Sequence, residues 1–92
     1  MAYRIKFSAR ALSEIAEAHD WYEAKSPGLG EEFLAAVDLQ LKRLEQAPLL
    51  YAETIPSVRR ALLPRFPYGV FYAVRKDIVH ILAVIHNARN PR

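Results

Sequence analysis

The sequence predicts an α+β domain in which a helical hairpin packs on a mainly antiparallel sheet, in the order β-α-α-β-β-β. Residues 68–74 and 78–85 are rich in β-branched and aromatic side chains, and the short polar segment 75–77 between them is typical of a hairpin turn. Residues 58–63 are predicted to form a preceding strand. Residues 64–67 are the connection to the next strand, because their prolines fix φ and remove a donor of the strand ladder. These three strands therefore form a predicted antiparallel meander.

The N-terminal part predicts a strand followed by a helix. Residues 3–7 alternate apolar and charged side chains with period two, which indicates a half-buried strand that joins the sheet. Ser8 is a suitable N-cap for a helix from Ala9 to about Lys25. Helical spacing places on the inner side of this helix Leu12, Ile15, Ala16, His19 and Tyr22. The same spacing places on its solvent side Glu14, Glu17 and Glu23.

A second helix is expected after a break at residues 26–30, where one proline and two glycines interrupt the first helix. This helix runs from about Gly30 to Ala47, and Pro48 ends it. Its apolar stripe consists of Phe33, Leu34, Val37, Leu41 and Leu44. Residues 49–56 are predicted to be an apolar linker that leads into the meander.

Composition predicts a single domain spanning residues 1–92, of ordinary soluble globular character, with 52% hydrophobic and 25% charged residues. The absence of cysteine excludes disulfides, thiolate nucleophiles and zinc–sulfur sites. The three histidines have no metal-ligand spacing, so we expect no metal and no cofactor. No run reaches membrane-spanning length or resembles a signal peptide, which favours a cytoplasmic protein without a membrane partner.

Positive charge is concentrated in the C-terminal half of the chain. Residues 1–46 hold 6 Lys/Arg and 8 Asp/Glu, net −2, whereas residues 47–92 hold 7 and 2, net +5. A basic surface suits a nucleic acid or an acidic partner, and a solvated face without a ligand is the alternative. The candidate target-binding residues are Arg59, Arg60, Arg65, His86 and Arg89.

A series of short motifs extends along the whole chain. They are Phe7-Ser-x-Arg-Ala-Leu, Trp21-Tyr beside Ser26-Pro, Leu44-x-x-x-Pro48, Val58-Arg-Arg-Ala, Phe66-Pro-Tyr68, Tyr72 and His86-x-x-Arg89-x-Pro91. In this order and spacing, the chain resembles the RelE/ParE superfamily of toxins from bacterial type II toxin–antitoxin modules. The resemblance implies the two-layer fold described above and the function of a growth-inhibiting toxin.

The resemblance is closer to ParE than to RelE. The RelE-like messenger-RNA endonucleases carry an arginine after the tyrosine that opens the central strand, whereas this chain has Gly69 after Tyr68. They also commonly place a catalytic tyrosine near the C-terminus, where this chain ends in residues 90–92, Asn-Pro-Arg. The resemblance therefore implies a toxin that inhibits DNA gyrase by binding and is not an enzyme. The first alternative is a ribosome-dependent endonuclease with the catalytic candidates Arg65, His86 and Arg89, and the second is a non-toxic antitoxin-binding protein.

The resemblance also implies a partner. Toxins of this superfamily form hetero-oligomers with a cognate antitoxin, here ParD-like, whose C-terminal tail wraps the toxin and often adds a strand to a sheet edge. The helical hairpin carries the large side chains that such a tail is expected to cover, which are Trp21, Tyr22, Leu29 and Leu34. DNA gyrase, or in the endonuclease alternative the ribosome, is the expected target.

Overall fold

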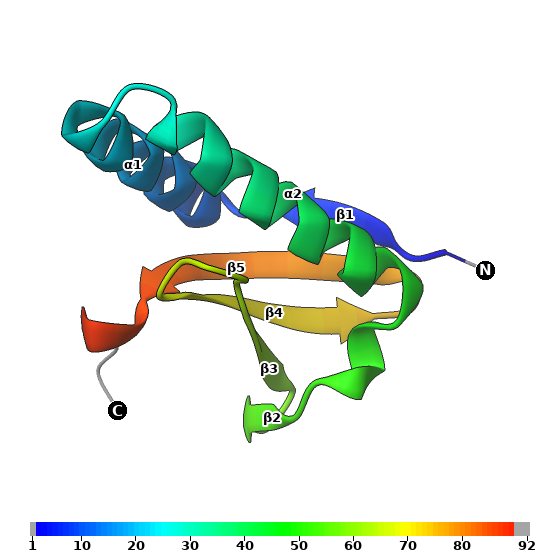
Figure 1. The fold of residues 1–92 in the computed structure, drawn as a ribbon. Coiled ribbons are helices and arrows are strands. Elements are labelled where there is room, and N and C mark those ends of the chain that lie inside the picture. Colours follow the sequence, from blue (N-terminus) through cyan, green and yellow to red (C-terminus); the bar gives the residue numbers. More distant parts are fainter. Residues whose placement is uncertain (1, 90–92) are drawn as a thin grey trace.

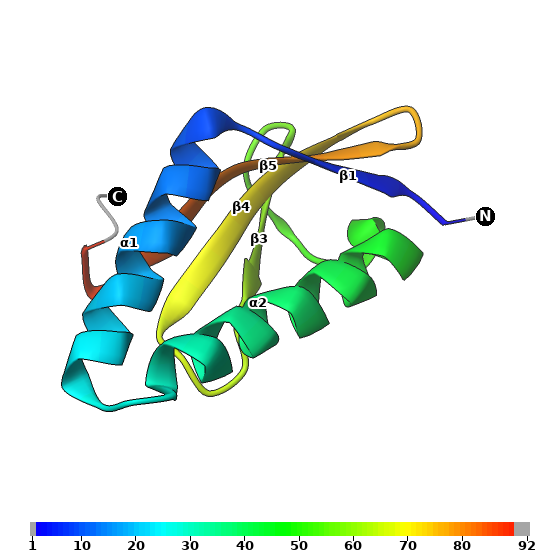
Figure 2. The same ribbon diagram turned by 90° about the horizontal axis from the view of Figure 1, so that it is seen from above.

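The computed structural model describes residues 2–89, except for the side chain of Arg89, and shows two helices on one face of a sheet (Figure 1). Within these residues the helices and strands are β1 (Arg4–Phe7), α1 (Ala9–Lys25), α2 (Leu29–Gln46), β2 (Glu53–Ile55), β3 (Val58–Leu62), β4 (Tyr68–Arg75) and β5 (Ile78–His86), with short 3-10 helices η1 (Pro48–Leu50) and η2 (Asn87–Arg89). The predicted α+β class is confirmed. The two helices meet at their turn and diverge across the sheet (Figure 2).

The sheet has the order β1-β5-β4-β3-β2 within the described residues, so that β4 and β5 lie at its centre. β1 pairs with β5 in parallel, and the other neighbouring strands pair antiparallel. The predicted meander and the predicted N-terminal strand are both present in this sheet. Because α1 and α2 cover one face, the other face is open to solvent (Figure 1).

The expectation that residues 49–56 form a linker without a strand is wrong. This segment contains η1 and then β2, which extends the sheet beyond β3. The observed order is therefore β-α-α-β-β-β-β. The three residues of β2 are all exposed, and their side chains carry no alternating burial pattern that would have indicated a strand. β2 forms because the edge of β3 offers it backbone partners.

The N-cap of α1 is confirmed, whereas part of its predicted inner face is wrong. Ser8 Oγ accepts a hydrogen bond from the Ala11 backbone N–H at 2.9 Å. The buried residues of α1 are Ala11 and Ala18, and Leu12 is 54% exposed. Ala16 is also exposed. The helix is rotated so that small alanine side chains face inward, which permits a close approach between α1, α2 and β5.

The apolar stripe of α2 is confirmed as part of the core. Phe33, Val37 and Leu44 are buried, and Leu34 and Leu41 pack against the core as partly buried side chains. A cluster of four rings joins the hairpin to the start of β4, with centroid separations from 5.0 to 6.2 Å. Its members are Tyr22, Phe33, Phe66 and Tyr68.

Buried polar side chains hold the segment around η1 beneath α2. Tyr72 is 0% exposed, and its hydroxyl donates to the backbone oxygen of Pro48 at 2.6 Å. Gln40 is 2% exposed, and its amide donates to the Leu62 carbonyl at 2.6 Å and accepts from the Tyr51 hydroxyl at 3.3 Å. These bonds satisfy polar groups that would otherwise be costly to bury.

Candidate functional site

Arg59 is held by the chain's own linker. Its guanidinium donates to the backbone oxygens of Tyr51 and of Leu49, the latter at 3.4 Å, and lies 3.6 Å from a carboxylate oxygen of Glu53. Only 22% of the side chain is exposed. Arg59 thus fastens η1 and β2 to β3, a role that the sequence pattern did not indicate.

Arg60 lies on the opposite, open face of β3. Its neighbour across the ladder is Phe71, whose ring centroid is 6.0 Å from the guanidinium carbon. Its aliphatic stem passes over Gly69, where an added Cβ would lie 3.0 Å from Arg60 Cδ. The glycine that distinguishes this chain from the RelE-like pattern therefore provides the space in which Arg60 lies.

Arg65 lies in the connection between β3 and β4 and is directed toward the start of α2. Its Nη2 is 2.7 Å from Glu32 Oε1, and its guanidinium carbon is 5.6 Å from the centroid of the Phe66 ring. The backbone of Arg65 has a φ of 69°, a left-handed conformation that places the side chain outside the strand alternation. Two thirds of the side chain remains exposed.

His86 ends β5 and packs edge-on against Tyr68, with the ring centroids 5.1 Å apart. Its Nδ1 accepts a hydrogen bond from the Ala88 backbone N–H at 3.0 Å, which fixes the start of η2. Arg89 follows in η2, and its side chain lies outside the described part of the structure. Among the described residues no hydrogen bond or ion pair joins Arg65 to His86.

The four residues expected to contact an antitoxin differ in accessibility. Trp21 is 56% exposed, whereas Tyr22, Leu29 and Leu34 are partly buried and pack against the core. The ring of Trp21 has the Lys25 ammonium nitrogen 4.7 Å from its centroid. Of these four side chains, Trp21 therefore offers the main contact surface to a partner.

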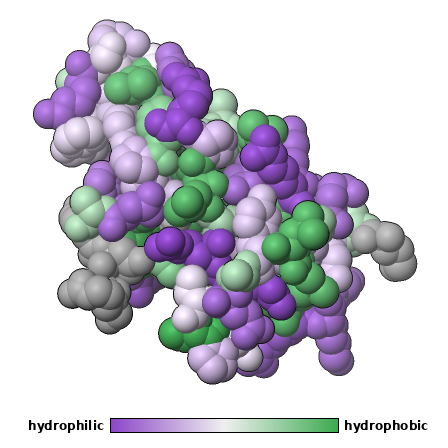
Figure 3. Space-filling model, turned by 60° about the horizontal axis from the view of Figure 1, so that its bottom comes forward, coloured by the Kyte–Doolittle hydropathy of each residue, from purple (hydrophilic) through white to green (hydrophobic). Residues whose placement is uncertain are grey.

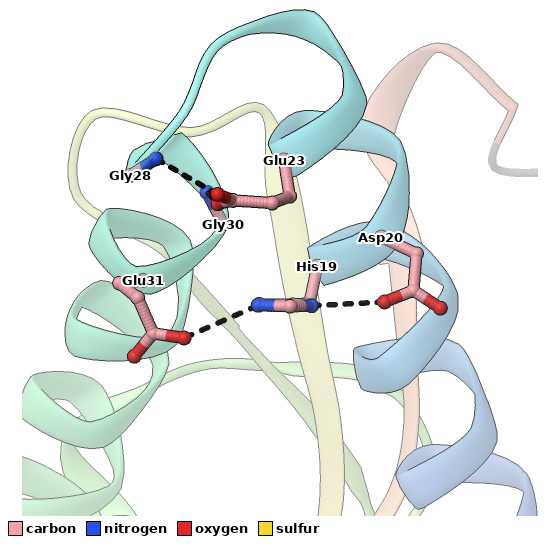
Figure 4. A network of polar contacts seen from close by, with 6 residues as sticks. All are labelled: His19, Asp20, Glu23, Gly28, Gly30 and Glu31. Atoms are coloured by element: carbon pink, nitrogen blue, oxygen red, sulfur yellow. Dashed lines mark hydrogen bonds and ion pairs between the residues drawn. The ribbon is translucent and has the colours of Figure 1, made fainter.

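The turn between α1 and α2 carries a polar network that the sequence pattern did not reveal (Figure 4). The Glu23 carboxylate accepts from the backbone N–H groups of Gly28 and Gly30, each at 2.9 Å, and these bonds lower the pKa of Glu23. His19 lies between Asp20, at 2.9 Å, and Glu31, at 3.2 Å. The bond to Asp20, followed by that to Glu31, raises the pKa of His19 above its usual value.

Comparison with known proteins identifies the family. The family described as the ParE toxin of type II toxin–antitoxin system, parDE, matches residues 5–91. The chain belongs to this ParE toxin family. Toxin ParE2 of Mycobacterium tuberculosis is 29% identical over 92 residues, which cover 99% of this chain and 88% of the relative.

Solved structures show the same fold. The chromosomal ParDE toxin–antitoxin system from P. aeruginosa has a chain that matches with a TM-score of 0.81 at 21% identity, covering 92% of this chain and 96% of that chain. The intact E. coli RelBE toxin–antitoxin complex matches with a TM-score of 0.64 at 20% identity, covering 90% and 94%. The fold is thus closer to the ParDE structure than to the RelBE structure.

The described residues of this ParE-family chain contain neither a candidate membrane span nor a candidate metal cluster. No helix within residues 2–89 is long and apolar enough to cross a membrane. Across the same residues, no group of three or more histidine, aspartate and glutamate side chains is arranged to hold a metal ion.

Proposed function

We propose that this ParE-family toxin stops growth by binding DNA gyrase, without catalysing a reaction, and that a ParD-like antitoxin neutralises it. The observation that carries the proposal is the arrangement of Gly69 and Arg60. The RelE-like endonucleases have an arginine at the position of Gly69, and here a side chain at that position would press on Arg60 at 3.0 Å. The arginine that the endonucleases carry at this position, where a cation would stabilise the charge that develops in phosphodiester cleavage, is therefore absent, which supports a toxin that acts by binding.

The proposed target surface contains the basic groups of β3, of the β3–β4 connection and of the C-terminal segment. It consists of Arg60, Arg65, His86 and Arg89. Arg59 supports this surface from the covered side of the strand, because its guanidinium is engaged by the linker. A surface of this charge fits an acidic region of the target.

The proposed antitoxin surface begins at Trp21 on α1. Both structural relatives described above come from toxin–antitoxin assemblies, which supports a partner of the same kind for this chain. Figure 3 shows the molecule with the side opposite the two helices turned toward the viewer, where hydrophobic side chains form separate clusters with hydrophilic side chains between them. An extended segment that folds on binding can cover separated clusters of this kind, whereas a rigid flat partner requires one continuous patch.

The test is a supercoiling assay with purified gyrase, run beside a translation extract probed for messenger cleavage. We expect inhibition of supercoiling and intact messenger. Cleavage without inhibition of gyrase would instead support the endonuclease alternative. Normal growth after induced expression, with folded protein present, would support the non-toxic antitoxin-binding alternative.

A pair of charge reversals tests the target surface. Arg65→Glu and Lys42→Glu change the same charge at side chains that are 67% and 69% exposed, and each removes one ion pair with a carboxylate, Glu32 or Asp38. We expect Arg65→Glu to abolish gyrase inhibition and Lys42→Glu to preserve it, while both variants melt close to the parent protein. Equal inhibition by the two variants would remove Arg65 from the target surface.

A further inference from the structure

A hollow of about 540 Å³ lies between α1 and the C-terminal end of β5, and we name it the α1–β5 hollow. Its walls include Glu14, Glu17 and Trp21 from α1, and Tyr68 and His86 from the sheet. β4 pairs with one edge of β5 as far as His86, whereas β1 pairs with the other edge only as far as Ile81, so beyond Ile81 that second edge pairs with no strand of the described chain. The hollow is therefore open to a partner.

The charge of the α1–β5 hollow favours a cation. Glu17 is exposed, and among the described residues no hydrogen bond or ion pair engages its carboxylate. Glu14 accepts from the Val84 backbone N–H at 2.8 Å and from Arg10 Nε at 3.0 Å, so it caps the strand edge and its charge is partly offset by Arg10, which leaves Glu17 as the carboxylate without a cationic partner among the described residues. Two carboxylates thus line the hollow against a single imidazole, that of His86.

Tyr68 adds an unused hydrogen-bonding group. The residue is 5% exposed, yet its hydroxyl makes no hydrogen bond to any residue in the described range and still touches solvent. A hydroxyl that is nearly buried normally finds a partner, because an unpaired polar group costs free energy. In the hollow this oxygen is an acceptor that is open to the N–H groups of a ligand.

Trp21 supplies the aromatic wall, and the chain itself shows that its ring attracts a cation. The Lys25 ammonium lies 4.7 Å from the ring centroid, although Lys25 is not part of the lining of the hollow. An arginine side chain suits this combination better than a lysine, because a planar guanidinium both stacks on an indole and presents several N–H donors to carboxylate and hydroxyl oxygens.

We propose that the α1–β5 hollow binds an arginine side chain carried by an extended segment of the antitoxin. The identity of the partner rests on the proposed function, whereas the preference for arginine rests on Glu17, Glu14, Trp21 and Tyr68 alone. The hollow then serves as a fixed attachment point for the tail, from which the rest of the tail continues across the helical hairpin.

The single tryptophan of the sequence makes the test direct, because Trp21 fluorescence reports on the hollow without a label. The probe is an acetylated tetra-arginine amide, and its matched control is the tetra-citrulline amide, which keeps the shape and removes the charge. The protein variants are Glu17→Gln, within the hollow, and Glu45→Gln, a control on α2 whose side chain makes no hydrogen bond or ion pair in the described structure.

We expect tetra-arginine to change the Trp21 fluorescence saturably and tetra-citrulline to leave it unchanged. Glu17→Gln should raise the Kd for tetra-arginine about threefold or more and Glu45→Gln should not, because an exposed ion pair is removed only in the first variant. The Kd for tetra-arginine should also rise when salt is increased from about 0.05 to 0.5 M.

Equal binding of the two peptides, or equal Kd values for the two variants, would overturn the proposal. Binding that appears only after Arg92→Gln would assign the hollow to the chain's own C-terminal residues and would also overturn the proposal.

The variants Glu17→Gln and Glu45→Gln are then titrated with purified antitoxin, and only Glu17→Gln should weaken the toxin–antitoxin complex. An unchanged affinity of the Glu17→Gln variant for the antitoxin would contradict the assignment of the arginine to the antitoxin. Because the peptide titration requires neither gyrase nor antitoxin, a toxin that binds tetra-arginine but leaves gyrase active would refute the proposed function and retain the arginine site.

Discussion

The hydroxyl of Tyr72 is one of the groups that fix the segment after α2 to the sheet, and Tyr72→Phe measures its contribution. The substitution removes the donor to the Pro48 carbonyl at 2.6 Å inside a fully buried site. The carbonyl then stays buried without its partner, so we expect the free energy of unfolding to fall by about 1–3 kcal/mol. For a domain of this size, each 1 kcal/mol corresponds to a decrease in Tm of about 4–8 °C.

Alkaline pH gives the Tyr72→Phe experiment a second signal. Burial raises the pKa of Tyr72 from 10.0 to about 12, so the stabilising contribution of the protonated hydroxyl is complete below pH 10 and is lost as pH rises toward 12. The difference in stability between parent and variant should therefore shrink across that window.

Tyr51→Phe is the control for Tyr72→Phe, because the Tyr51 hydroxyl donates to Gln40 over 3.3 Å from a partly buried position. We expect a smaller loss there. A loss below about 0.5 kcal/mol for Tyr72→Phe in urea denaturation would refute the structural role assigned to this hydroxyl.

Three further outcomes follow from the core and the helical turn. Leu44→Ala should lower the free energy of unfolding by about 2–5 kcal/mol, and Leu39→Ala, at a side chain that is 45% exposed, by clearly less; equal losses in denaturant would contradict the assigned core. Gly30→Ala should lower Tm, because its Cβ would lie 2.7 Å from the His19 ring and 2.8 Å from the His19 carbonyl. The pKa of His19 is raised, so its contribution to the stability of the folded state is present below pH 6.5 and is lost as pH rises through the pKa of the folded state. His19→Gln should therefore make Tm less dependent on pH between pH 6 and 8. An unchanged dependence of Tm on pH would exclude a stabilising role for the contacts of His19 with Asp20 and Glu31.

The periodic elements of the fold could be predicted from the sequence, whereas β2 could not. The strands and helices that were predicted carry their own pattern, either the alternation of residues 3–7 or the helical stripe from Phe33 to Leu44. Residues 53–55 carry no such pattern, and they pair because β3 presents a free edge and Arg59 holds the preceding backbone. Such a strand depends on tertiary contacts that local sequence does not encode.

The buried face of α1 could be predicted only in part from the helical spacing of apolar residues. Of the large apolar side chains expected inside, Ile15 and Tyr22 pack against the core, whereas Leu12 is exposed and the buried positions are Ala11 and Ala18. Helical spacing gives several adjacent faces with similar hydrophobicity when alanines are frequent, and the distance between packed elements then decides which face turns inward. The position of the Glu14 carboxylate also follows from this rotation, because the carboxylate accepts a hydrogen bond from the backbone N–H of Val84, which lies beyond the part of β5 that pairs with β1.

The candidate site shows why residue types alone do not define a surface. Strand alternation predicts that Arg59 and Arg60 lie on opposite faces, and the register agrees, but it does not say which guanidinium is already engaged. In the structure the Arg59 guanidinium is bound to the backbone of the linker, whereas Arg60 lies beside Phe71 and over Gly69. Gly69 stands where the RelE-like endonucleases have an arginine, which favours binding over cleavage as the proposed function. The same glycine leaves room for the side chain of Arg60, which places a cation on the open face. Gly69 and Arg60 therefore support the proposed binding toxin as a pair, and neither residue supports it alone.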